Sequence, residues 1–214
     1  MHCAICETRR PRRYCPGLRS EICSICCGAE REVTVACPLE CPYLEEARKH
    51  EKPPEPDMQQ YPSPEVELSE DFLRGNEPLV AFMSVTLSRI ALSSPGAVDS
   101  DVREALDALV RTYRTLDSGL IYQTRPANLV AAAIQQRAQA ELDEFRKRRK
   151  EQLGIETLRD NDILGILVLL QRLGFERNNG RPRGRAFIEF LFREFAEVPA
   201  SVPPPPGSGL IVPA

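Results

Sequence analysis

The stretch EICSICCGAE, residues 21–30, places three cysteines within five positions: Cys23, Cys26 and Cys27. All 8 cysteines of the 214-residue chain fall within its first 41 residues. A segment of about 50 residues is too short to fold on a hydrophobic core alone. Residues 1–50 therefore form a separate cysteine-rich module, and its folding depends on what the thiols bind.

Two features of the sequence bear on whether these thiols form disulfides. Residues 1–13, MHCAICETRRPRR, lack the apolar segment of a secretory leader. No apolar run approaches the roughly 18 residues that span a bilayer. We therefore expect a cytoplasmic protein that has no membrane segment. Disulfides are rare in that reducing compartment, so metal binding is the better explanation for the cysteines.

The spacing of four cysteines is typical of a zinc site. Cys3-x2-Cys6 and Cys23-x2-Cys26 are two knuckles with sixteen residues between them. Each knuckle can bind one edge of a tetrahedron, and thiolates are preferred ligands of Zn²⁺. The remaining cysteines form a second set of four: Cys15, Cys27, Cys37 and Cys41. The sequence thus predicts two structural Zn²⁺ sites, each closed by four cysteines and without an open position for catalysis.

Local patterns predict how the two sets share one short module. Successive side chains of an extended strand point to opposite sides, so we expect Cys26 and Cys27 to serve different sites from one strand. The β-branched residues 33–35 predict another strand, and residues 42–50 predict a short helix. Cys41 then lies near the N-cap of that helix, where the helix dipole stabilises a thiolate.

Several alternatives stay open at this level. The cysteines can pair sequentially, with the first four and the last four as separate sets, although the neighbours Cys26 and Cys27 would then have to bind one ion. His50 is an optional substitute for one cysteine ligand. One zinc ion with spare thiols, an iron–sulfur cluster with four cysteines, and disulfides in an oxidising compartment are further alternatives.

Part of the module resembles known zinc fingers. YCPGLRSEICSICC, residues 14–27, is similar to the cross-brace two-zinc fingers of the HIT and MYND kind, in which a Cys-Pro is followed by Tyr/Ile-Cys-Ser-x-x-Cys. CSICCG, residues 23–28, also resembles the core of small bacterial proteins thought to chelate zinc or iron. The resemblance implies a treble-clef-like module that holds two zinc ions. Residues 67–214 resemble no family that we recognise.

The remainder of the chain is predicted to be mainly α. The proline-rich residues 51–66 favour an extended linker. Apolar residues at helical spacing then predict an all-α domain over residues 67–198 with about five helices. The expected helices span residues 77–94, 101–119, 125–154, 161–174 and 183–197, packed around 161–174, which is apolar on nearly every face. Residues 199–214 form a second proline-rich segment, a tail.

Two arginine-rich loops are candidates for contact with nucleic acid or a partner. Their arginines are Arg9, Arg10, Arg12 and Arg13 in the module, and Arg181, Arg183 and Arg185 in the helical domain. The alternative for the first loop is compensation of the negative charge of Zn(Cys)₄ centres. The alternative for the second loop is pairing with nearby carboxylates. The formal net charge of −3 indicates no general attraction to nucleic acid.

No catalytic motif is apparent in the sequence. It has no glycine-rich phosphate loop, no HExxH and no nucleophile elbow. We therefore expect a non-enzymatic zinc-binding interaction or regulatory protein whose helical domain binds a protein partner. The alternatives are a nucleic-acid-binding regulator that uses the arginine loops, and a redox or metal sensor that uses one cysteine set.

Overall fold

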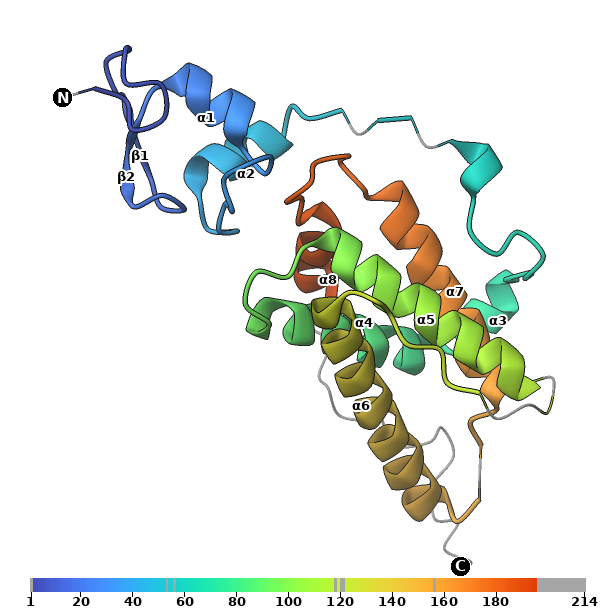
Figure 1. Ribbon diagram of the computed structural model, residues 1–214. Coiled ribbons are helices and arrows are strands. Elements are labelled where there is room, and N and C mark those ends of the chain that lie inside the picture. Colours follow the sequence, from blue (N-terminus) through green and yellow to red (C-terminus); the bar gives the residue numbers. More distant parts are fainter. Residues whose placement is uncertain are drawn as a thin grey trace, which may run out of the picture.

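The computed structural model describes residues 2–52, 54–55, 57–117, 119, 122–155 and 157–195. A small N-terminal lobe packs against one end of a larger helical bundle (Figure 1). The prediction of a mainly α chain with a small cysteine-rich module is therefore confirmed. The predicted tail, residues 199–214, lies outside the described residues. Within the described part, we find no helix that combines the length and apolar character required to cross a membrane.

The lobe consists of a short hairpin followed by two short helices. Strand β1 (Arg13–Cys15) pairs antiparallel with β2 (Ser20–Ile22), and helices α1 (Ser24–Glu30) and α2 (Pro42–Arg48) follow. Both helices begin directly after a cysteine, because Cys23 and Cys41 are the N-caps. The predicted helix with Pro42 at its start and Cys41 at its N-cap is confirmed.

In the described part of the chain, the bundle contains five long helices and one short one. They are α3 (Glu70–Gly75), α4 (Glu77–Ser93), α5 (Asp99–Asp117), α6 (Leu129–Leu153), α7 (Asp160–Glu176) and α8 (Ala186–Phe195). Helix α7 is buried over most of its length, as its apolar sequence predicts. It is not the sole centre, however, because α4 and α5 each pack against α6, α7 and α8.

The predicted apolar stripes form the bundle core. On α5, the side chains of Val102, Leu106, Leu109 and Tyr113 are each at most 1 % exposed. On α4, four residues at helical spacing are buried as well: Leu79, Met83, Thr86 and Ile90. Burial of one large apolar side chain contributes about 1.5–3 kcal/mol. The bundle therefore has a core of its own, independent of the cysteine lobe.

Three helix starts differ from the prediction by two residues or more, and one of them is α8, which begins at Ala186 rather than at residue 183. The other two have local reasons. Helix α5 begins at Asp99 rather than at residue 101, and the Asp101 carboxylate accepts the N–H of Val98 at 2.9 Å. Helix α6 begins after Asn128 rather than at residue 125, because the Asn128 side chain accepts the N–H groups of Val130 and Ala131. A side chain that bonds the free N–H groups of the first turn determines where a helix begins.

Part of the expected linker is attached to the bundle. Arg172 on α7 donates to the carbonyl oxygens of Pro62, Ser63 and Val66, at 3.3, 2.6 and 2.7 Å. Its guanidinium also lies over the Tyr61 ring, 5.2 Å from the centroid. Residues 61–66 therefore lie along α7 rather than spanning free space between the lobe and the bundle.

A buried carboxylate joins the first turns of α5 and α8. Asp99, which is 3 % exposed, accepts the backbone N–H groups of Phe187 and Ile188, both at 3.0 Å. The N–H of Asp99 donates to the carbonyl oxygen of Gly184 at 2.8 Å. Burial raises the pKa of Asp99 to about 6, even though the two N–H bonds oppose this shift.

We expect the pH dependence of stability to report this carboxyl group. An unfolded aspartic acid titrates near pKa 3.9. Because the pKa of Asp99 is raised in the folded protein, its protonated form stabilises the fold. This contribution to the unfolding free energy is complete below about pH 4, and it is lost, by at most about 3 kcal/mol, as pH rises through about 6. Asp99→Asn cannot ionise, so the difference in unfolding free energy between wild type and variant should shrink over this range.

Urea unfolding at a series of pH values between about 4 and 7 measures that difference. Asp71→Asn is the matched control, because the Asp71 side chain is 93 % exposed. A difference between wild type and the Asp99→Asn variant that stays constant with pH would contradict the assignment.

Candidate metal centre

Four cysteines from three parts of the lobe form one compact cluster. The Sγ atoms of Cys3, Cys6, Cys23 and Cys26 all lie within 4.8 Å of one another. Zn–S bonds of about 2.3 Å in a regular tetrahedron separate the sulfurs by about 3.8 Å. Among the described residues, no other group of three or more candidate ligands is this close together. The two predicted knuckles therefore meet in a donor set that fits a single metal ion.

Backbone hydrogen bonds hold the two knuckles together. The N–H of Ala4 donates to the carbonyl oxygen of Glu21 on β2 at 3.0 Å. The N–H of Cys23 donates to Cys3 Sγ at 3.2 Å, and the N–H of Cys26 donates to Cys23 Sγ at 3.4 Å. Hydrogen bonds donated to sulfur stabilise the thiolate form, which is the form that binds metal.

The cluster is electrostatically unbalanced without a cation. The Thr8 hydroxyl, helped by the backbone N–H groups of Thr8 and Arg9, lowers the pKa of Cys6 to about 5. Burial raises the pKa of Cys26 to about 12, and its hydrogen bonds to neighbouring cysteines add to this shift. The pKa values of two neighbouring thiols are thus shifted in opposite directions, that of Cys6 downward and that of Cys26 upward. A bound divalent cation would allow all four thiols to ionise, with release of their protons.

The second set of cysteines lines one small pocket. Cys15, Cys27, Cys37 and Cys41 line a space of about 10 Å³ together with other side chains, among them Tyr14, Arg31 and Tyr43. The four thiols thus face one small space, but they are not gathered as closely as those of the first set. Burial raises the pKa of Cys37, and its neighbours Cys41 and Cys15 contribute to the shift. The arrangement matches the interleaved pairing of the two sets rather than the sequential pairing. None of the eight cysteines forms a disulfide.

The predicted strand at Cys26 and Cys27 is wrong. Both residues lie on helix α1, where neighbouring side chains diverge by about 100°. Cys26 thereby joins the first set, whereas Cys27 lines the second pocket. The two thiols therefore point to different cysteine sets, as expected, but they do so from one helix rather than from one strand.

The predicted strand at residues 33–35 is wrong as well. The N–H groups of Val33, Thr34 and Val35 all donate to the carbonyl oxygen of Glu30, at 3.0–3.2 Å. This turn provides hydrogen-bond donors to a carbonyl oxygen at the C-terminal end of α1. The local hydrogen bonds override the β preference of the three residues. His50 is exposed and lies 3.3 Å from Glu46, so it does not replace a cysteine.

No family model, curated protein or solved structure matches this chain significantly. The similarity to cross-brace zinc fingers therefore rests on motif spacing alone.

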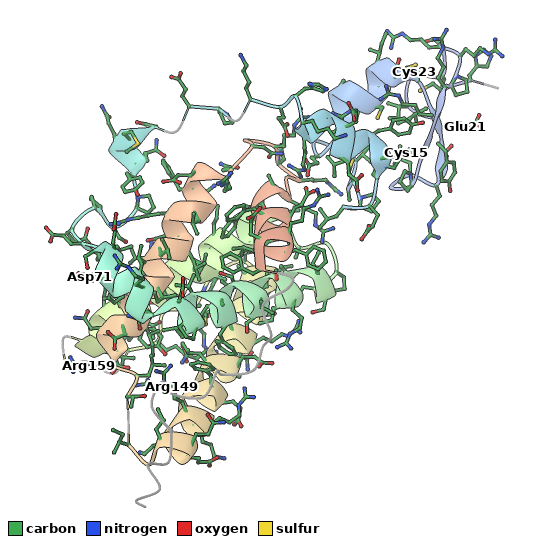
Figure 2. All side chains as sticks on the ribbon, turned by 180° about the vertical axis from the view of Figure 1, so that it is seen from behind. Cys15, Glu21, Cys23, Asp71, Arg149 and Arg159 are labelled. Carbon is green, nitrogen blue, oxygen red and sulfur yellow. The ribbon has the colours of Figure 1, made fainter. Side chains whose placement is uncertain are left out.

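Two arginines of the first loop face the sulfurs. Arg9 Nη1 lies 4.0 Å from Cys26 Sγ, and Arg13 Nη1 lies 3.5 Å from Cys27 Sγ. Arg13 also lies over the Tyr43 ring, 4.5 Å from its centroid. The side chains of Arg10 and Arg12 are exposed. Arg9 and Arg13 are thus placed to compensate thiolate charge, one at each cysteine set (Figure 2 labels Cys15 and Cys23 from the two sets).

A buried carboxylate joins the lobe to the bundle. Glu32 lies just after α1 and is 0 % exposed. One carboxylate oxygen accepts Arg48 Nη2 at 2.8 Å and the backbone N–H of Arg185 at 3.0 Å. The other accepts Asn179 Nδ2 at 2.9 Å, and the Glu32 carbonyl accepts the N–H of Arg183 at 2.8 Å. Charged side chains are almost never fully buried unless they are paired.

Arg48 and Arg181 extend this contact on both sides. Arg48 Nε lies 2.5 Å from Glu189 Oε2 on α8. Arg181 Nε pairs with Glu51 at 3.0 Å, and its Nη1 donates to the carbonyl oxygen of Arg31 at 2.7 Å. The second arginine loop therefore makes contacts within the chain. Arg181 uses its side chain, Arg183 and Arg185 use their backbone, and only the Arg183 side chain is exposed among the three.

Sequence reasoning missed Glu32, Arg48 and Asn179. Nothing in the residue pattern marks Glu32 as buried, because its apolar neighbours Val33 and Val35 predicted a strand instead. The sequence indicated only that the arginines in the loop before a helix would pair with carboxylates. It did not indicate which of its many carboxylates they would pair with.

Replacing Glu32 by Gln should weaken the contact between lobe and bundle. Gln keeps the shape but loses the charge, so the charged hydrogen bond from Arg48 is lost. We expect a loss of about 2 kcal/mol in the unfolding free energy, measured by urea denaturation. Glu46→Gln on the exposed side of α2 is the control and should change stability by less than about 0.5 kcal/mol. Equal effects of the two substitutions would disprove a special role for Glu32.

Proposed function

We propose that this chain is a non-enzymatic zinc protein in which two structural Zn²⁺ ions fold the cysteine lobe. The cluster of Cys3, Cys6, Cys23 and Cys26 is the observation that carries the proposal. A single ion holds four thiolate sulfurs at the corners of one small tetrahedron. A four-iron cluster lies between the four sulfurs and therefore keeps them farther apart. The observed separations favour a single ion, and thiolate donors favour zinc.

Zinc at these sites would supply folding free energy rather than reactivity. Four cysteines saturate the tetrahedron, which leaves no position for a substrate or an activated water. The lobe core consists of the cysteines with few other buried side chains, among them Ile22, Val35 and Leu44. Metal binding would therefore decide whether this lobe folds.

The folded lobe would present a surface to a protein partner. Nine large apolar side chains are exposed in the described residues, and four of them belong to the lobe: Tyr14, Leu18, Ile25 and Val33. Such a concentration on so small a unit favours an interaction surface. The nucleic-acid alternative is less well supported, because Arg9, Arg13 and Arg181 already make contacts within the chain.

Elemental analysis of anaerobically purified protein tests the metal proposal. We expect two zinc ions per chain and a colourless protein. Cys6→Ser with Cys26→Ser should remove one ion, and Cys15→Ser with Cys37→Ser should remove the other. Bound zinc that is unaffected by the second pair of substitutions would reject the second site. Iron with visible absorption would overturn the proposal in favour of a cluster and a redox role.

Ile25→Glu tests the interaction surface. Ile25 is 60 % exposed on α1, so the substitution should leave folding intact but prevent apolar contact with a partner. Leu129→Glu is the matched control, because Leu129 is also exposed but lies on α6. Proteins that co-purify with the tagged chain from its native cells should be lost with Ile25→Glu and kept with Leu129→Glu. Identical sets for wild type and both variants would argue against this surface.

A further inference from the structure

A polar pocket lies in the bundle, lined by residues outside the cysteine lobe. It has a volume of about 290 Å³ and is bounded by α5, α7 and residues 60–63. Helix α5 supplies Arg103, Asp107, Val110, Arg111 and Arg114. Their spacing of four, three, one and three residues places them on one face of the helix. The volume is close to the lower limit of small-molecule sites.

The walls of the pocket are held in place by their own hydrogen bonds. Gln171 on α7 donates to Asp107 Oδ1 at 2.6 Å and accepts the Ser63 hydroxyl at 2.8 Å. Arg172 fixes the backbone at Ser63 from the other side. Asp107 and Gln171 are thus already engaged with each other.

The three arginines differ in their partners. Arg114 pairs with Glu65. The side chains of Arg103 and Arg111 form no ion pair or hydrogen bond with any residue in the part of the chain that the structure describes. The Arg103 stem packs on Gly174 of α7, where an added Cβ would lie 3.2 Å from Arg103 Cγ. This contact orders the stem at the edge of the pocket and leaves the guanidinium available.

We propose that this pocket binds a small organic phosphate. With Arg114 paired to Glu65, the two guanidinium groups of Arg103 and Arg111 outweigh the single carboxylate of Asp107, and the pocket carries a net positive charge. A phosphate monoester, at about −1.5 to −2 at pH 7, is attracted to it more strongly than a carboxylate with one negative charge. Guanidinium groups also bind phosphate oxygens in a bidentate manner. Val110 and the Phe175 ring provide an apolar surface for the organic part of the ligand.

Calorimetric titration of the full-length, metal-loaded chain tests this site. The probes are inorganic phosphate, phenyl phosphate and benzoate, at constant chloride ionic strength. Phenyl phosphate should bind more tightly than inorganic phosphate because its ring contacts Phe175. Benzoate has the same ring with a single negative charge and should bind most weakly. Absence of binding by both phosphate probes would overturn the proposal.

Arg103→Met and Arg111→Met should each weaken binding of phenyl phosphate about ten-fold or more. Methionine retains part of the arginine stem, so the packing on Gly174 is preserved and folding is checked by circular dichroism. Arg74→Met is the matched control, because it removes the same charge from an exposed position on α3. If all three variants weaken binding equally, the attraction is a general charge effect and the pocket is not the site.

Discussion

The carboxylate of Glu32 has no access to water, and so its charge must be balanced within the protein. Arg48 supplies the balancing charge from the lobe, whereas Asn179 and the Arg185 N–H supply hydrogen bonds from the bundle. Removing Arg48 would leave the Glu32 charge buried without its cation, which costs about 3–5 kcal/mol. The lobe and the α7–α8 loop are therefore stable in this arrangement only together.

This constraint connects the cysteine sites to the bundle core. The Glu32 backbone hydrogen bonds to Cys37 of the second set and opposes the rise in its pKa. On the other side, the loop held by Glu32 leads through Gly184, whose carbonyl oxygen accepts the N–H of Asp99. Asp99 in turn bonds the first turn of α8. A change at the second cysteine set would thus reach α8, although the apolar side chains of the bundle and those of the lobe form separate clusters.

The sequence predicted those features that depend on spacing along the chain. Knuckles of Cys-x2-Cys identify the first set, and the stripe from Val102 to Tyr113 identifies α5, because each pattern is local. It did not predict features that depend on partners far apart, such as Glu32, which lies 147 residues from Asn179. The adjacent pair Cys26 and Cys27 was misassigned for a different reason. Either a strand or a helix can direct neighbouring side chains to different sites, so the spacing alone does not distinguish them.

The arginines illustrate the same limit in another way. Contiguous runs attracted attention in the sequence, yet Arg9 and Arg13 face sulfurs, and Arg181 pairs with Glu51. Arg103 and Arg111 stand eight residues apart and form no run, but two turns of α5 bring them to one pocket. Once α5 is recognised as a helix, its polar face can be examined with the same periodicity as its apolar face. Charge that is dispersed in the sequence but aligned on a helix is therefore the stronger indication of a binding site in this protein.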